Sequence, residues 1–262
     1  MKPKIQPVIS LWILVALSLM IFLAISFSED FHIGKYRPTR ATFRETLLAT
    51  PFQQTPDTVT TDTIPPVAVD TLVEPDTTIR KVLIFGDSMT HNLAMSIARY
   101  GSRNNYKVTS VTWESSSILA WGTDPKLSEY LAEVKPDFVI VSLGSNEMEL
   151  KNFDARAPYV KKIIEKIDTL PYIWVGPPLW KEDRGLYGML EKNVEPGKLF
   201  RIESLDLERG PDHVHPTKKG ADIWADTLMR WQLKTEHPIP ADIPDSASTT
   251  KGHRFIYLHP DN

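Results

Sequence analysis

Apolar residues in the middle of the chain form short continuous runs, and turn-forming residues follow each run. The first run covers residues 81–85 and ends at Gly86, and the most apolar run covers residues 138–143. Uninterrupted runs that are rich in β-branched and aromatic residues predict strands buried on both faces. Strands are therefore expected at 81–85, 108–113, 138–143, 172–175 and 199–202.

Segments with a helical spacing of apolar residues lie between these runs. In the segment 155–170, Val160, Ile163 and Ile167 fall on one face, as in an amphipathic helix that packs on a sheet. Helices are expected at 93–100, ending at Gly101, and at 126–134, 155–170, 185–193 and 221–232. This alternation predicts an α/β fold with a parallel sheet and helices on both sides, and in such folds ligands bind beyond the carboxyl ends of the strands.

The first 28 residues contain an apolar run of a different kind. Lys2 and Lys4 precede an uncharged stretch at 8–27, which is long enough for a helix that crosses a hydrocarbon core of ~30 Å. Positive charge before the stretch predicts that the N-terminus lies inside and the rest of the protein outside the cytoplasm, in the periplasm or on the cell surface. A cleavable signal peptide is the alternative, and its removal would make the protein secreted.

The rest of the chain divides by composition. Residues 29–79 are interpreted as a juxtamembrane segment and a linker rich in proline and threonine, because 50–78 has no helical or strand period. Residues 80–234 form the predicted folded domain. Residues 235–262 form a polar C-terminal tail, in which 255–258 is a candidate for an extra strand.

Composition excludes several classes of function. The net charge of -3 comes without a basic stripe, which argues against a nucleic-acid partner. The chain has no cysteine, so disulfides, thiolate metal sites and a cysteine nucleophile are excluded.

Three polar segments contain the parts of a serine esterase, and each follows a predicted strand. Ser88 lies in a Gly-Asp-Ser turn, Asn146 follows Gly144, and Asp212 precedes His215 by three residues. A serine hydroxyl needs a base to take its proton, the base must be oriented, and the oxyanion needs hydrogen-bond donors. The spacing of Asp212 and His215 lets a carboxylate reach the imidazole across one turn.

Each of these segments also has a simpler interpretation. Ser88 suits the N-terminus of a helix as a cap, and Asn146 suits a turn by its backbone preferences. Asp212, His213 and His215 have the chemistry of metal ligands, but no further histidine or paired carboxylate stands nearby in the sequence. We therefore expect neither a metal nor a cofactor.

The three segments together resemble the SGNH (GDSL-type) hydrolase superfamily, over Lys81 to about Trp231. Residues 86–89 resemble its GDS block, 144–147 its GxND block with glutamate in place of aspartate, and 212–215 its DxxH block. The resemblance implies a flavodoxin-like, three-layer α/β/α sandwich. It also implies a triad of Ser88, His215 and Asp212, which Asp87 and Gly144 support.

The resemblance further implies an oxyanion hole made by the backbone amide of Ser88, the side chain of Asn146 and an amide of the second block. The family usually has a glycine there, whereas this chain reads Trp-Glu-Ser-Ser-Ser-Ile over 113–118. We expect the amide of Ser116 to replace that of the glycine, with Ser117 as the alternative.

The expected function is hydrolysis of an ester through an acyl-serine intermediate. A domain held outside the membrane would meet envelope glycans, so O-acetyl groups on a carbohydrate are the expected substrate class. Four tryptophans offer stacking surfaces for sugars, and these are Trp113, Trp121, Trp174 and Trp180. An O-acyltransferase with the same triad and a non-catalytic binding module of the envelope are the alternatives.

Overall fold

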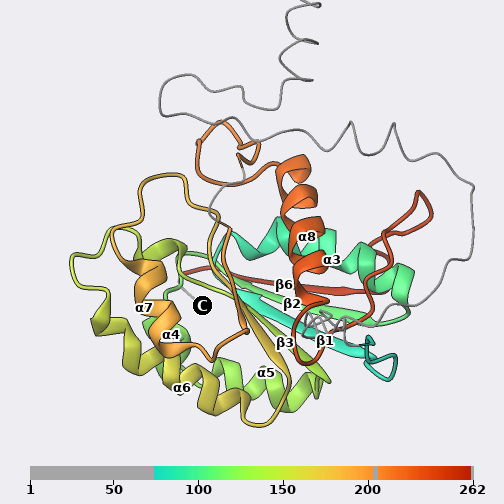
Figure 1. Ribbon diagram of the computed structural model, residues 1–262, viewed down its shortest axis with the longest axis horizontal. Coiled ribbons are helices and arrows are strands. Elements are labelled where there is room, and N and C mark those ends of the chain that lie inside the picture. The colour runs from blue at the N-terminus through green and yellow to red at the C-terminus, as the bar shows by residue number, and fades with distance from the viewer. Residues whose placement is uncertain (1–73, 203–205, 261–262) are drawn as a thin grey trace, which may run out of the picture. The chain divides into compact units, whose positions relative to one another are not determined.

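The structure is a computed structural model that describes residues 74–202 and 206–260. At its centre lies an open sheet of six parallel strands in the order β5-β4-β3-β1-β2-β6 (Figure 1). The strands are β1 (Lys81–Gly86), β2 (Lys107–Trp113), β3 (Phe138–Ser142), β4 (Tyr172–Val175), β5 (Leu199–Phe200) and β6 (Arg254–Leu258). The α/β class that the sequence pattern predicts is confirmed.

Helices cover both faces of the sheet (Figure 1). One face is covered by α3 (Thr90–Asn104) and α8 (Lys218–Gln232). The other is covered by α4 (Ile118–Thr123), α5 (Lys126–Val134), α6 (Ala157–Ile167) and α7 (Leu186–Asn193). Two short 3₁₀ turns, Ser145–Glu147 and Asp154–Arg156, lie between β3 and α6.

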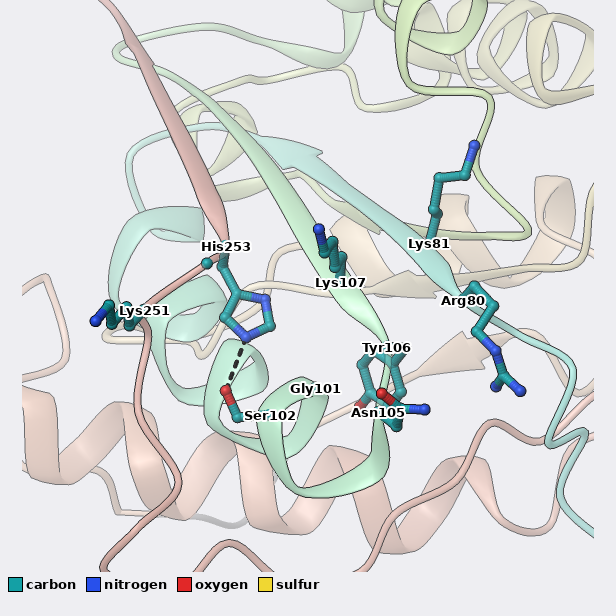
Figure 2. A pocket seen from close by; sticks show the side chains of 10 residues that line it. Arg80, Lys81, Gly101, Ser102, Asn105, Tyr106, Lys107, Lys251 and His253 are labelled. Atoms are coloured by element: carbon teal, nitrogen blue, oxygen red, sulfur yellow. Dashed lines mark hydrogen bonds between the residues drawn. The ribbon is translucent and has the colours of Figure 1, made fainter.

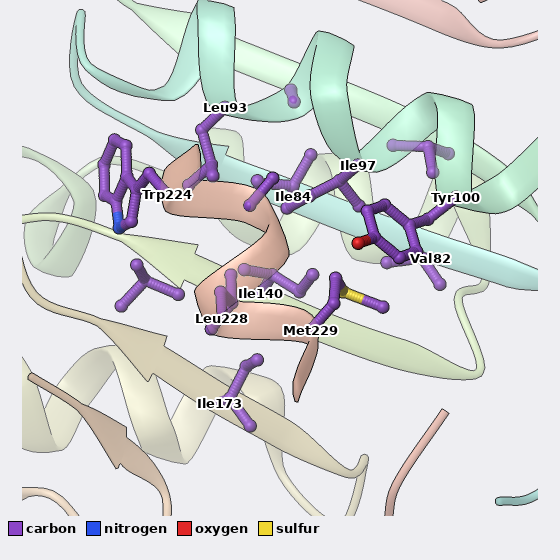
Figure 3. Close-up of a cluster of buried hydrophobic side chains, with 14 of the residues drawn as sticks. Val82, Ile84, Leu93, Ile97, Tyr100, Ile140, Ile173, Trp224, Leu228 and Met229 are labelled. Carbon is purple, nitrogen blue, oxygen red and sulfur yellow. The ribbon is translucent and has the colours of Figure 1, made fainter. Parts of the chain in front are cut away.

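Side chains of each central strand point alternately to the two faces. In β1, Val82 and Ile84 pack with α3 and α8, whereas Leu83 and Phe85 pack with the helices opposite. Figure 3 shows the first of these clusters, in which Ile84 lies among side chains of both helices. Burying one such side chain stabilises the fold by roughly 1.5–3 kcal/mol, which explains why these strands are apolar throughout.

One expected helix end is wrong. The sequence predicted that the helix after β1 stops at Gly101, but α3 continues through this glycine to Asn104. Gly101 is needed for close packing, because a Cβ atom there would lie 2.6 Å from the carbonyl oxygen of Tyr106. The helix ends instead at Asn105, which takes the left-handed conformation with a φ of 61°.

The segment after α8 packs against the domain. The side chain of Gln232 accepts a hydrogen bond from the amide of Ile239 and donates one to its carbonyl oxygen, both at 2.8 Å. Strand β6 then pairs in parallel with β2, with Tyr257 opposite Thr112. The extra strand that the sequence suggested is present, and it places part of the expected tail in the sheet.

The expected N-terminal anchor or signal segment and most of the expected linker lie outside the described residues. Among the helices of residues 74–202 and 206–260, none is long and apolar enough to span a membrane.

Candidate active site

Ser88, His215 and Asp212 form a continuous chain of hydrogen bonds. The Oγ atom of Ser88 lies 2.9 Å from Nε2 of His215, and Nδ1 of His215 lies 2.7 Å from Oδ2 of Asp212. An ionised carboxylate can only accept, so Nδ1 carries the proton and Nε2 is left to accept from the serine. The structure thus brings Ser88 to the distant turn that holds Asp212 and His215, in the order that base catalysis requires.

The turn that carries Asp212 and His215 is held by its own backbone. The Oδ1 atom of Asp212 accepts hydrogen bonds from the amides of Val214 at 3.0 Å and His215 at 3.1 Å. The bonds from the His215 ring and from these two amides lower the pKa of Asp212 to about 2. Asp212 is therefore a carboxylate at neutral pH, and it fixes the direction of the imidazole.

Arg209 ties this turn to the loop that follows β4. Its guanidinium donates hydrogen bonds to the carbonyl oxygens of Val214, Pro178 and Leu179, the last two at 3.1 and 2.9 Å. The sequence analysis did not single out Arg209, because nothing in its neighbourhood of the chain shows which carbonyl groups it meets.

The turn that carries Ser88 is packed tightly against the end of β3. A Cβ atom on Gly86 would lie 1.8 Å from the carbonyl oxygen of Ser142, so no other residue fits there. The buried carboxyl group of Asp87 accepts from the amides of Met89 and Ser145, both at 3.1 Å. Burial raises the pKa of Asp87 despite these bonds. Asp87 thus connects the serine turn to the loop that begins at Gly144, whose φ is 130°.

The loops after β2 and β3 meet at Asn146 and Ser116. The Nδ2 atom of Asn146 donates to the carbonyl oxygen of Ser116 at 2.7 Å, which leaves its second N–H for another acceptor. The amide of Ser116 donates to the carbonyl oxygen of Trp113 at 3.2 Å. Within the described part of the chain, the amides of Ser88 and Ser117 have no hydrogen-bond partner. Of the two candidates in the second block, Ser117 thus has the available amide.

Glu147 is a buried residue that the sequence analysis noted only as a departure from the family pattern. Its side chain is fully buried, and Oε1 accepts from the amide of Ile118 at 2.9 Å and lies 3.4 Å from Nε of Arg156. Burial is the main cause that raises its pKa to about 7. Glu147 therefore joins the first residue of α4 to the loop that carries Asn146.

The metal-site alternative gains no support from the geometry. His213 is exposed, and residues 74–202 and 206–260 contain no group of three or more side chains placed to hold a metal ion. No protein-family model matches the chain, and no match was found among curated proteins. The chemistry of the site is therefore argued from its own residues.

A separate cavity of about 550 Å³ lies at the opposite edge of the sheet, near the start of β1 and β2 (Figure 2). Arg80, Lys81 and Lys251 line it, but their side chains point in different directions in Figure 2. The ring of His253 accepts from the amide of Val108 at 2.9 Å and lies 3.0 Å from the hydroxyl of Ser102. Because its basic side chains do not converge, this cavity is a weaker candidate site than the Ser88 edge.

Proposed function

We propose that this protein is a serine esterase of the SGNH type. The observation that carries the proposal is the chain of hydrogen bonds from Ser88 through His215 to Asp212, at 2.9 and 2.7 Å. A serine that only capped a helix would need no imidazole at hydrogen-bond distance, and an imidazole that only packed would need no carboxylate behind it.

In the proposed reaction, Nε2 of His215 takes the proton of Ser88 as Oγ attacks the ester carbonyl carbon. The carbonyl oxygen becomes an oxyanion, and the tetrahedral intermediate collapses as His215 returns the proton to the leaving alcohol. Water then attacks the acyl-serine with His215 again as the base, and this step releases the carboxylic acid and restores Ser88. Asp212 stabilises the imidazolium in both halves of the cycle.

The proposed oxyanion hole consists of the Ser88 amide, the free N–H of Asn146 and the Ser117 amide. The absence of an internal partner for the two backbone amides supports this choice. It revises our expectation for the second block from Ser116 to its neighbour, since the Ser116 amide is used within its own turn. Removing one such donor typically lowers turnover by ~10²–10³.

The position of the site in the sheet supports the same function. Apart from β6, the strands follow the order 2-1-3-4-5, which is the flavodoxin-like order that the resemblance implies. Ser88 follows β1, Ser117 follows β2, and Asn146 follows β3, so all three lie at the carboxyl ends of adjacent strands. The strand order reverses at β1, and ligands of open α/β sheets bind at such a point.

The openness of the site is compatible with hydrolysis. The side chains of His215 and Asp212 are 42% and 50% exposed, so water has direct access to an acyl-serine. We propose O-acetylated envelope carbohydrate as the substrate. The protein would meet it outside the cytoplasm, either anchored in the membrane or secreted. This location rests on the apolar segment of residues 8–27.

Hydrolysis of 4-nitrophenyl acetate by the full-length protein tests the proposal, with Ser88→Ala and His215→Ala compared in parallel. We expect turnover that both substitutions reduce by at least about 10³-fold and that a metal chelator leaves unchanged. Activity that survives in Ser88→Ala would contradict the proposed mechanism.

A further inference from the structure

Three aromatic and imidazole rings form a continuous row at the carboxyl edge of the sheet. The rings of His91 and Tyr257 contact each other edge to face, with centroids 5.8 Å apart. The ring centroids of Tyr257 and His259 are 5.2 Å apart. We call His91, Tyr257 and His259 the ring row.

The ring row lies close to the nucleophile. Ser88 lies in the turn that leads into α3, and His91 is the second residue of that helix, three residues after Ser88 in the chain. Tyr257 shares a face of β6 with Phe255, which packs in the cluster of α3 and α8. His215 comes from the loop that precedes α8, so the ring row and the catalytic base lie on the same side of the sheet.

The row combines an exposed apolar surface with groups that form hydrogen bonds. Tyr257 is 43% exposed, and the side chain of His259 is 63% exposed. Nδ1 of His259 lies 3.2 Å from Oε2 of Glu114, and the amide of Glu114 donates to the carbonyl oxygen of Leu258 at 2.9 Å. Partial burial and the charge of Glu114 raise the pKa of Tyr257, so its hydroxyl keeps its proton.

We propose that the ring row is the subsite that binds the pyranose ring of the acylated substrate. A sugar presents an apolar face of C–H groups and a rim of hydroxyls, so it suits an exposed aromatic ring beside a hydroxyl, an imidazole and a carboxylate. An acyl chain would instead need an enclosed apolar pocket. The inference rests on the proposed esterase function, and it identifies what holds the alcohol side of the ester.

This assignment replaces the expectation that Trp113, Trp121 and Trp174 stack with the sugar, whereas Trp180 is only partly buried and stays a prediction. Trp121 and Trp174 have no exposed surface. Trp113 is half-buried, packs against Trp121 and is covered by the ammonium group of Lys126 at 4.7 Å. Tyr257 is exposed and its ring contacts the ring of His91, three residues after Ser88.

Two acetate esters with different alcohols distinguish a change in the sugar subsite from a change in the triad. Glucose pentaacetate offers a pyranose ring, and triacetin offers the same acyl group on glycerol. For full-length protein in mild detergent, we expect Tyr257→Ala to lower kcat/KM on glucose pentaacetate by about tenfold, mainly through KM, because a ring contact is lost. We expect Tyr257→Phe to retain most of that activity, and both variants to hydrolyse triacetin as the wild type does.

The remaining outcomes have distinct meanings. An equal loss on both esters would overturn the inference, because it would mean that Tyr257 acts through the fold or the triad. Unchanged kinetics on both esters in Tyr257→Ala would also overturn it, while leaving the esterase intact. A wild-type protein that hydrolyses none of glucose pentaacetate, triacetin and 4-nitrophenyl acetate would overturn the proposed function itself and the subsite with it.

Discussion

Glu147 presents a fully buried carboxyl group whose Oε2 atom has no hydrogen-bond partner within the described residues. Burial raises its pKa from an ordinary value of 4.5 to about 7. The folded protein therefore binds the proton of the Glu147 carboxyl group more tightly than the unfolded chain does. This proton's contribution to the free energy of unfolding is complete below pH 4.5 and is lost as the pH rises through about 7. The Glu147→Gln variant has no such proton to lose. Relative to the wild type, its free energy of unfolding should rise by roughly 3 kcal/mol between about pH 5 and about pH 8.

Urea unfolding of both proteins at the two pH values measures this change. Glu149→Gln is the matched control, because Glu149 lies two residues away, is 83% exposed and has a pKa lowered by Lys181. The control should show no gain in stability with rising pH. If the curves of Glu147→Gln and the wild type shift in parallel with pH, then Glu147 does not titrate with the raised pKa.

Among the elements, those with a strong local pattern were predictable and those that depend on partners were not. The helix at 126–134 and the strand at 172–175 match α5 and β4 at both ends, because helical spacing marks the first and a continuous apolar run marks the second. Helix α4 was not predicted, since it has six residues and its first amide is held by Glu147. Likewise, the expected strand at 199–202 is reduced to two residues, because only Leu199 and Phe200 pair with β4.

The connection between α8 and β6 depends on one buried side chain. Gln232 has no exposed surface, and its amide group satisfies both backbone groups of Ile239. In Gln232→Leu these two groups lose their partner, so we expect a destabilisation of about 3 kcal/mol and faster hydrogen exchange in β6. Gln232→Glu keeps an acceptor for the Ile239 amide, but at neutral pH it places a buried carboxylate beside the Ile239 carbonyl oxygen, so it should be destabilised at least as much. Exchange in β6 that stays at the wild-type rate in Gln232→Leu would show that β6 docks independently of this contact.

At the scale of the whole molecule, the proposed catalytic residues and the proposed sugar subsite lie on different parts of the sheet. The candidate triad and oxyanion donors belong to loops after β1, β2 and β3 and before α8, and their order was readable from the sequence because each motif follows an apolar run. Two of the rings beside them were not readable, because Tyr257 and His259 reach the site only through the pairing of β6 with β2. No local pattern in 235–262 shows which strand it joins.

This division predicts the behaviour of a chain that ends at residue 240 and therefore lacks β6. The triad keeps all its contacts, so triacetin hydrolysis should persist while the preference for glucose pentaacetate disappears.

The loss of β6 leaves β2 as an open edge. The sequence of β2 is rich in β-formers with one charged residue, so the truncated chain should self-associate. Sedimentation velocity measures this, with Tyr257→Ala as the control that keeps β6 and should sediment as the wild type does. A truncated chain that sediments as the wild type does and still prefers the pyranose ester would show that β6 neither protects β2 nor recognises the substrate.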